Sequence, residues 1–190
     1  MTSEPVEVTN VIEQARPRLQ WGRILVWGGL ILLLGMLAGG LLRTQRGPVL
    51  IGQNAPQFIL STFDGQQINT QDLAGKVLVV NFWASWCKPC EQEAADLEAA
   101  WKAYAPGEQV VFLGVDYVDT EPEALAYLNK FNITYPNGPD LRTRISQAYR
   151  IRGVPETYII DRQGKLAHVQ IGPFRDLAQI TGFIDPLVAP

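Results

Sequence analysis

The hydrophobic residues of this chain form one long run near the N-terminus and several shorter runs beyond it. Residues 24–42 read ILVWGGLILLLGMLAGGLL, without a charged side chain. As an α-helix this run would be roughly 28 Å long, close to the hydrocarbon core of a bilayer at about 30 Å. A buried core helix is usually shorter and has a polar face, and a cleaved signal peptide has a shorter apolar run and a small-residue cleavage site. The run therefore predicts a transmembrane signal-anchor helix that is not cleaved.

This helix divides the chain into segments. Residues 1–23 are polar and show no sustained period, so we predict a short cytoplasmic tail there. Residues 43–48 predict a brief linker, and residues 49–190 predict one domain, large enough to bury a core without a disulfide. Three arginines precede the helix and two follow it, a difference too small to set its orientation.

The chain after residue 48 begins with strand patterns. Two extended runs around Asp64-Gly65 predict a β-hairpin, because Asp-Gly favours tight turns. Thr70 is expected to cap the turn that follows. Residues 77–83, VLVVNFW, are apolar on both faces, which is typical of a strand in the middle of a sheet.

Helices and strands then alternate to the C-terminus. In chain order we predict a helix over 89–104, a strand over 110–115, helices over 121–131 and 140–149, an antiparallel strand pair over 157–160 and 166–171, and a helix over 174–187. The sequence therefore predicts an α/β fold with a mixed sheet in one domain.

Charge narrows the possible partners. Residues 47–190 carry eleven basic and sixteen acidic side chains, a net charge of −5, and the basic residues are not clustered. Nucleic acid is therefore not an expected partner.

The chain has two cysteines, which stand three positions apart in NFWASWCKPCEQE, residues 81–93. Cys87 follows the predicted central strand and Cys90 lies in the first turn of the next helix, with Pro89 where a helix tolerates proline. Unpaired N–H groups and the helix dipole stabilise a thiolate there. In a C-x-x-C spacing one sulfur can attack a disulfide while the other resolves the mixed disulfide. We predict that Cys87 is the nucleophile and Cys90 the resolving thiol.

Three other roles for the pair have less support. A structural disulfide gains little from closing so short a loop. A zinc site needs four ligands and the chain has one histidine, His168, so we expect no metal and no catalytic role for this histidine. Two inert buried cysteines would seldom lie at a strand-to-helix junction with a proline between them.

The sequence around the cysteines resembles the thioredoxin superfamily. Five ordered segments within about residues 50–173 narrow the resemblance to the membrane-anchored TlpA/ResA/CcmG (DsbE) group of extracytoplasmic thiol-disulfide oxidoreductases: IGQNAPQFIL, DGQ, DLAGK, VLVVNFWASWCKPCEQE and AYRIRGVPETYIIDRQGKL. The resemblance implies a thioredoxin-like fold, with helices flanking a central mixed sheet and an N-terminal β-hairpin extension. It also implies a cis bond between Val154 and Pro155 at the active site, where the Val154 backbone would pair with an extended substrate chain.

The resemblance also assigns an acid to the site. Thioredoxins carry a buried aspartate six positions before the first cysteine, where this chain has Asn81. In the membrane-anchored group a glutamate three residues after the second cysteine takes a related place, and Glu93 matches it. A partly buried Glu93 would lie on one helix face with Cys90 and could exchange a proton with it; a solvated Glu93 is the alternative. Glu91 and Glu98 are expected to be solvated.

Three further residues complete the predicted site. Glu156 follows the expected cis proline, in the Pro-Glu-Thr run typical of the cytochrome c maturation members. It would tune the acid or contact the substrate, unless it lies on the surface of a strand. Trp86 would shield Cys87 and offer a flat apolar contact, unless it belongs to the core. Lys88 should favour the Cys87 thiolate slightly, because solvent screens its charge.

These features predict a reductant on the outer side of a bacterial-type membrane. A redox dithiol on an anchored chain fits an extracytoplasmic domain with the tail inside, where a tethered reductant keeps chosen cysteines reduced. The resemblance implies a membrane dithiol donor of the CcdA or DsbD type. It implies as substrate the C-x-x-C pair of apocytochrome c, or a chaperone that presents it. No cofactor is expected.

Other functions stay open. A general envelope disulfide reductase, or an oxidase, would use the same dithiol on another substrate. The opening IGQNAPQFIL also resembles peroxiredoxins, although those place threonine three residues before their reactive cysteine, where this chain has Ala84. A non-catalytic binding module is the remaining alternative.

Overall fold

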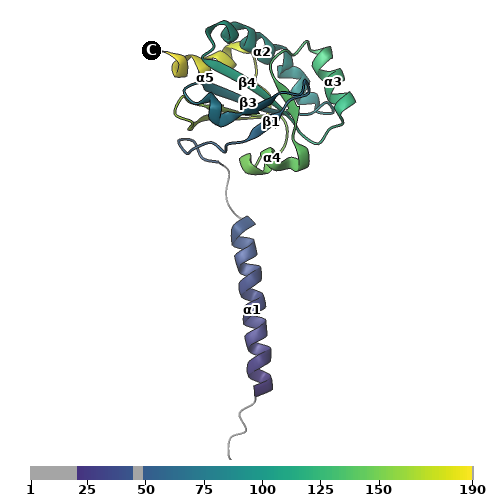
Figure 1. Cartoon of the computed structure of the whole chain (residues 1–190), viewed down its shortest axis with the longest axis vertical. Helices are drawn as coiled ribbons and strands as arrows, with labels where there is room; N and C mark the ends of the chain where they lie inside the picture. Colours follow the sequence, from purple (N-terminus) through teal and green to yellow (C-terminus); the bar gives the residue numbers. More distant parts are fainter. Residues whose placement is uncertain (1–20, 45–48, 190) are drawn as a thin grey trace, which may run out of the picture. The chain divides into compact units, whose positions relative to one another are not determined.

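The computed structural model describes residues 21–44 and 49–189, and the chain forms two compact units, residues 1–46 and 47–190 (Figure 1). Most of the predicted cytoplasmic tail, residues 1–20, lies outside the described residues, as do residues 45–48 of the predicted linker.

The described part of the first unit is one helix, α1 (Trp21–Thr44), which contains the whole predicted span of 24–42. Residues 21–23 and 43–44 are therefore helical, where the sequence predicted tail and linker. In α1 the residues whose exposure is described, Gly22 and 24–40, are all exposed. Among the residues whose structure is described, no helix has both the length and the apolar character needed to cross a membrane.

The second unit is built on a five-stranded mixed sheet with the strand order β5-β4-β3-β6-β7. The central strand β3 (Val77–Trp83) runs parallel to β4 (Val110–Asp116), and β4 runs parallel to β5 (Asn137–Pro139). On its other side β3 pairs antiparallel with β6 (Glu156–Ile160), which pairs antiparallel with β7 (Leu166–Ile171). The predicted mixed sheet and its terminal antiparallel pair are confirmed.

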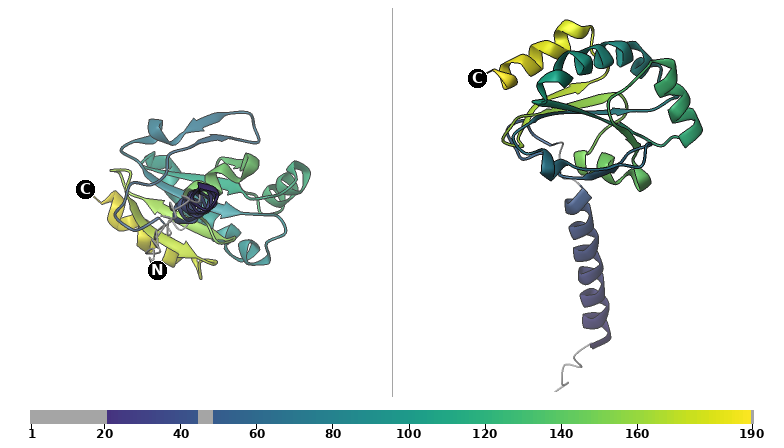
Figure 2. Two further views of the ribbon diagram at one scale, coloured as in Figure 1. Left: turned by 90° about the horizontal axis from the view of Figure 1, so that it is seen from below. Right: turned by 45° about the horizontal axis from the view of Figure 1, so that its top comes forward.

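Helices cover both faces of this sheet. They are α2 (Lys88–Tyr104), α3 (Glu121–Lys130), α4 (Arg144–Tyr149) and α5 (Leu177–Val188), with the short 3-10 helices η1 (Thr70–Leu73), η2 (Ala105–Gly107) and η3 (Leu141–Thr143). Val77 and Val79 pack in one core with α2 and α5, whereas Leu78 and Val80 pack in another with α4, because successive side chains of a strand point to opposite faces. Figure 2 shows α2 and α5 on one side of the sheet and α4 on the other. A strand that is apolar on both faces is therefore buried on both, as predicted for 77–83.

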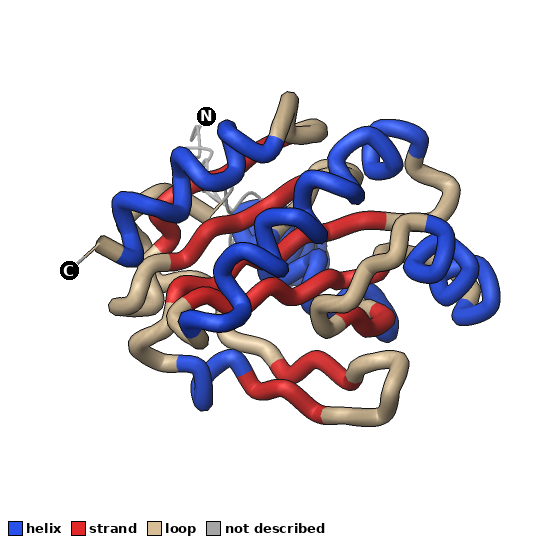
Figure 3. Tube along the Cα trace, turned by 90° about the horizontal axis from the view of Figure 1, so that it is seen from above, coloured by secondary structure: helices blue, strands red, loops and turns tan. Residues whose placement is uncertain are grey.

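The predicted N-terminal hairpin is also confirmed. Its strands, β1 (Ile59–Ser61) and β2 (Gln67–Asn69), pair antiparallel, and Figure 3 shows them as a separate pair beside the main sheet. Gly65 has a φ of 85° in the connecting turn, a conformation that glycine adopts without steric cost. The Asp64-Gly65 dipeptide thus turns the chain as its sequence predicts.

Thr70, however, does not cap the turn after the hairpin. The cap of η1 is Asn69, whose side chain accepts a hydrogen bond from the Gln71 amide at 3.1 Å. The Thr70 hydroxyl instead accepts from the Phe58 amide at 3.0 Å and donates to the Phe58 carbonyl at 3.2 Å. A long-range contact therefore occupies the side chain that local sequence assigned to the cap.

The predicted helix over 140–149 is broken in two. Arg142 and Thr143 have φ values of 61° and 54°, left-handed conformations that interrupt an α-helix. The Asp140 carboxylate accepts hydrogen bonds from the amides of Ile145 and Ser146 at 2.9 and 2.7 Å, which satisfies the first turn of a new helix. Only the second half of the predicted helix is therefore α-helical.

Two other elements differ from the prediction. α5 begins at Leu177 rather than at 174, because Asp176 caps it by accepting a hydrogen bond from the Gln179 amide at 2.8 Å. β5 was not predicted, since Asn-Gly-Pro has no strand-like pattern. The helices α2 and α3 and the strands β3, β4, β6 and β7 agree with their predicted ranges to within one residue at each end, whereas η2 was not predicted.

Gly114 in β4 provides a test of the packing beneath the cysteines. A Cβ at this position would overlap the Asn137 side-chain oxygen, which accepts a hydrogen bond from Trp83 Nε1 at 2.8 Å. Gly114→Ala should therefore lower the free energy of unfolding by about 1–3 kcal/mol. Urea denaturation of the full-length protein measures this, with Gly107→Ala as control, because nothing lies within 4 Å of a Cβ there. An equally small effect of both substitutions would contradict the packing described.

Candidate functional site

The two cysteines lie at the start of α2, directly after the central strand. β3 ends at Trp83, and Cys87 is the N-cap of α2, with Pro89 in the first turn. Cys87 and Cys90 form a disulfide with 5.3 Å between their Cα atoms, and both are buried. The predicted junction of strand, proline and helix is thus confirmed as the place of the sulfur pair.

The helix start favours negative charge on Cys87. Its Sγ accepts a hydrogen bond at 3.2 Å from the Cys90 amide in the first turn of the helix, and the same amide also donates to the Cys87 carbonyl at 3.1 Å. In the reduced protein the same amide and the helix dipole would stabilise a thiolate on Cys87. Cys90 is more enclosed, with 1% of its surface exposed. This geometry supports Cys87 as the attacking sulfur and Cys90 as the resolving one.

Glu93 is a buried acid on the same helix, with 1% of its surface exposed. One carboxylate oxygen accepts from Asn81 Nδ2 at 2.9 Å, and the other accepts from the Phe174 amide at 2.9 Å. Burial raises the pKa of Glu93 from 4.5 to about 7, although both hydrogen bonds act in the opposite direction. The solvated alternative is therefore wrong, and Glu93 can take up and release a proton near neutral pH.

Asn81 explains how the site accommodates this acid. It pairs in register with Thr157 on β6, and its side-chain amide donates to Glu93 and to Thr157 Oγ1, each at 2.9 Å. An aspartate at this position would place a second carboxylate against Glu93 and repel it. An amide donor instead fits a site where the acid comes from the helix.

The Val154–Pro155 peptide bond is cis, as the resemblance implied. It borders a groove of about 310 Å³ that is also lined by Pro89, Ile171 and Pro173. Pro89 belongs to the active-site helix, so this groove adjoins the cysteine motif. The predicted pairing of a substrate chain with the Val154 backbone stays a prediction, and the groove gives it a place.

Glu156 lies beneath this loop and is buried, so the surface alternative is wrong. Its carboxylate accepts from the Arg152 amide at 2.7 Å and from the Tyr158 hydroxyl at 2.8 Å. These contacts fix the backbone that leads to Pro155. The predicted roles of Glu156 in tuning the acid or in contacting the substrate stay predictions.

Trp86 and Lys88 stand on either side of Cys87 at the surface. Trp86 is 58% exposed and donates from Nε1 to the Val118 carbonyl at 3.1 Å, so the core alternative is wrong. Lys88 is exposed, and its Nζ lies 3.3 Å from a Glu91 oxygen, which Lys130 also contacts at 3.2 Å. Because this ion pair and solvent both offset its charge, Lys88 can affect the Cys87 thiolate only slightly.

The other two glutamates of α2 differ from each other. Glu91 is partly exposed in the ion pairs with lysine, as expected for a surface position. Glu98 is buried and accepts from the amide and hydroxyl of Thr134 at 2.8 and 2.6 Å, so its predicted solvated state is wrong. His168 stacks on Phe183 in the terminal part of the fold and takes no part in the site.

Sequence reasoning missed two acids at the end of β4. Ser85 lies two residues before Cys87, and its amide and hydroxyl donate to the Asp119 carboxylate at 2.6 and 2.9 Å. Asp116 is buried, and burial first, then the charge and hydrogen bond of Asp119, raise its pKa to about 8. The parallel pairing of Trp83 with Asp116 brings this strand end to the cysteines. The available signal was the pair of aspartates at and just after the C-terminal end of β4.

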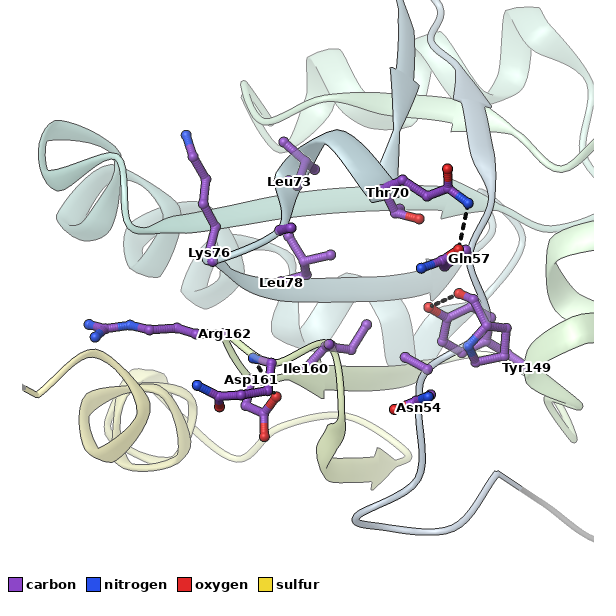
Figure 4. Close-up of a pocket in the computed structure, with 17 residues that line it drawn as sticks. Asn54, Gln57, Thr70, Leu73, Lys76, Leu78, Tyr149, Ile160, Asp161 and Arg162 are labelled. Carbon is purple, nitrogen blue, oxygen red and sulfur yellow. Dashed lines mark hydrogen bonds between the residues drawn. The ribbon is translucent and has the colours of Figure 1, made fainter.

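A second pocket lies at the opposite end of the sheet and holds none of the predicted site residues. It has a volume of about 490 Å³ and is lined by Lys76 and Asp161, which flank the distant ends of β3 and β6 (Figure 4). Leu78 and Ile160 contribute apolar side chains to it. This pocket is larger than the groove at Pro155, but it contains neither cysteine and is therefore not the redox site.

Comparison with known proteins gives the family. A family model described as the AhpC/TSA family matches residues 51–169, more than half of the chain. The chain belongs to the AhpC/TSA family. It is similar to the thiol-disulfide oxidoreductase ResA of Bacillus cereus, with 30% identity over 138 residues that cover 72% of this chain and 78% of the relative. It is also similar to the thiol:disulfide interchange protein DsbE of Allochromatium vinosum, with 37% identity over 145 residues, 74% of this chain and 76% of the relative.

A solved structure shares the fold of this AhpC/TSA family member. The thiol:disulfide interchange protein of the thioredoxin family from Chlorobium tepidum superposes with a TM-score of 0.66 and 27% identity, covering 76% of this chain and 99% of that one. The predicted thioredoxin-like fold is therefore confirmed. With a C-x-x-C disulfide at the start of α2, the chain is a protein thiol-disulfide oxidoreductase.

The buried acid makes the stability of the protein depend on pH. Because the pKa of Glu93 is raised on folding, its contribution is fully present below about pH 4.5 and is lost as the pH rises through about 7. Glu93→Gln should therefore reduce the fall in unfolding free energy between pH 5 and pH 9 by about 3 kcal/mol. Urea denaturation of the full-length oxidised protein at a series of pH values measures this difference.

Glu91→Gln on the same helix is the matched control. Its pKa is lowered, first by the hydrogen bond from Lys130, so Glu91 is ionised throughout this range and its removal should leave the pH slope unchanged. An unaltered slope in the Glu93 variant would mean that this carboxyl does not titrate with a raised pKa.

Proposed function

We propose that the protein reduces disulfides of apocytochrome c, or of a chaperone that presents it, on the extracytoplasmic face of a bacterial-type membrane. The observation that carries the proposal is the Cys87–Cys90 pair at the N-terminus of α2, next to the groove at Pro155 and on the same helix as the buried Glu93. These features supply an attacking sulfur, a contact for an extended chain, and a proton acceptor.

The reaction would proceed through a mixed disulfide. The Cys87 thiolate attacks one sulfur of the substrate disulfide, so that a bond forms to Cys87 and the other substrate sulfur leaves as a thiolate. Cys90 then attacks Cys87 and forms the intramolecular disulfide, which releases the second substrate thiol. Two electrons pass from the dithiol to the substrate.

Glu93 supports the second step. Cys90 must lose its proton before it can attack, and it stands three residues from Glu93 on the same helix, where both side chains are buried. A carboxyl with a pKa of about 7 is close to the ambient pH and can accept that proton. Asn81 holds the carboxylate in place during the transfer.

Location and recharging belong to the same proposal. The uncharged stretch over 24–42 lies within α1 and would anchor the chain in the bilayer, although the side chains of Leu41 and Leu42 lie outside the described residues. A domain tethered there would be reduced again by a membrane dithiol donor of the CcdA or DsbD type. This arrangement would confine the reductant to partners at the same membrane.

The proposed substrate rests on the Pro-Glu-Thr run at 155–157, which the resemblance links to the cytochrome c maturation members. A general envelope reductase and an oxidase are the rivals with the same chemistry. A peroxidase is less well supported, because Ala84 cannot supply the hydroxyl that peroxiredoxins place at that position. A binding module would have no use for a buried acid on the same helix as its disulfide.

Trapping the mixed disulfide tests the proposal. The full-length Cys90→Ser variant in detergent is mixed with apocytochrome c whose C-x-x-C pair is oxidised. It should accumulate a covalent adduct through Cys87, because no resolving thiol remains. Cys87→Ser should form none, because Cys90 is the more enclosed sulfur and lacks the N-cap position that favours a thiolate on Cys87. Mass spectrometry of the non-reduced sample detects the adduct.

An unrelated oxidised protein is the control for substrate choice. Equal rates of adduct formation with both would point to a general envelope reductase. Absence of any adduct, with disulfide transfer from the oxidised wild type to reduced apocytochrome instead, would contradict the proposed direction of electron flow.

A further inference from the structure

Two large apolar side chains stand exposed beside the cysteine motif. Trp86 directly precedes Cys87, and Val118 lies in the loop between β4 and α3; they are 58% and 59% exposed. The Trp86 indole donates to the Val118 carbonyl at 3.1 Å, so these residues from distant parts of the sequence are neighbours. An exposed apolar pair next to a reactive site is a candidate contact surface.

Four hydrogen bonds hold the loop 117–120 against the active-site loop 83–86. Besides the bond from Trp86, the Tyr117 amide donates to the Trp83 carbonyl at 2.8 Å. The amide and hydroxyl of Ser85 donate to the Asp119 carboxylate at 2.6 and 2.9 Å. Val118 therefore has a fixed position relative to Cys87.

The backbone at Val118 is unfavourable for its side chain. Its φ is 52°, in the left-handed region that β-branched residues rarely adopt, because the branched Cβ crowds the backbone. The exposed side chain gains nothing from core packing that would offset this conformation. A strained residue that carries an exposed apolar side chain is expected where function requires it.

The surroundings of Cys87 explain what such a residue would contact. Only 3% of Cys87 is exposed, so a substrate disulfide can reach it only by lying against the residues around it. The groove at Val154 and Pro155 borders the motif and can take an extended backbone. Trp86 directly precedes the same cysteine and Val118 contacts Trp86, and both carry apolar side chains that favour an apolar partner.

We propose that Val118 and Trp86 form a subsite for an apolar side chain next to the reactive cysteine of the substrate, so that Val118 determines specificity. The subsite adds a specificity determinant to the proposed function. It rests on that function, because the substrate is taken to be a protein disulfide that accepts electrons from the Cys87 and Cys90 thiols. The contact requires no co-reactant beyond those two thiols.

Two cyclic disulfide peptides test the subsite. Both contain Cys-Ala-Ala-Cys, flanked on both sides by leucine in one and by serine in the other, and each is mixed with pre-reduced full-length protein in a single turnover followed by tryptophan fluorescence. The wild type should reduce the leucine peptide about 10-fold faster than the serine peptide. Val118→Gly should bring the two rates together, and Val118→Leu should restore the preference. Glutathione disulfide is the reference substrate for the wild type, because its disulfide is not flanked by leucine.

Glu108→Gly is the matched control. Glu108 also has a φ of 52° and is exposed, but it precedes β4, whereas Val118 follows the strand at the other end. Both glycine substitutions relieve the same backbone conformation, so both should shift the melting temperature in the same direction. Only Val118→Gly should change the preference between the peptides.

The outcomes separate the two proposals. Retention of the leucine preference by Val118→Gly, or equal rates for both peptides with the wild type, would overturn the subsite and leave the proposed function standing. A wild type that reduces neither peptide but reacts with glutathione disulfide would overturn the proposed function and the subsite together.

Discussion

The burial of β3 on both faces is the constraint on which the rest of the site depends. A strand that is apolar on both faces must lie inside a sheet with helices on either side, so its C-terminal end emerges between two neighbouring strands. The loop after β4 contributes Asp119, which accepts hydrogen bonds from Ser85, and β6 contributes Thr157, which contacts Asn81. The C-terminus of β3 therefore gathers the parts of the redox site around Cys87.

The burial of the Glu93 carboxyl is energetically unfavourable. Burial disfavours its charged form, and two hydrogen bonds recover only part of what the carboxylate loses on leaving water. The result is an acid that changes its protonation state near neutral pH, on the same helix as a thiol that must be deprotonated to act. The free energy of folding that the buried Glu93 carboxyl costs is consistent with a role in proton transfer. The Asn81 amide donates to this carboxyl and can hold it in position for that transfer.

Much of the fold and the identity of the sulfur chemistry could be predicted from the sequence. The strand 77–83, the Asp64-Gly65 turn and the C-x-x-C motif are local patterns, and each produced the expected element. Contacts between distant segments could not be predicted in the same way. Glu98 has the sequence context of a surface glutamate, yet it binds Thr134, 36 residues away. The hydrogen bonds between Ser85 and Asp119 join residues 34 positions apart, and no periodic pattern in the sequence indicates them.

The reduction potential of the Cys87–Cys90 pair tests the central claim, that the dithiol is a reductant, most directly. The full-length protein in detergent is equilibrated with defined thiol-disulfide buffers, and the oxidised fraction is measured after acid quenching and thiol labelling. A reductant predicts a potential below about −200 mV, toward that of thioredoxin at about −270 mV. A value near −120 mV, typical of a strong disulfide donor, would contradict it.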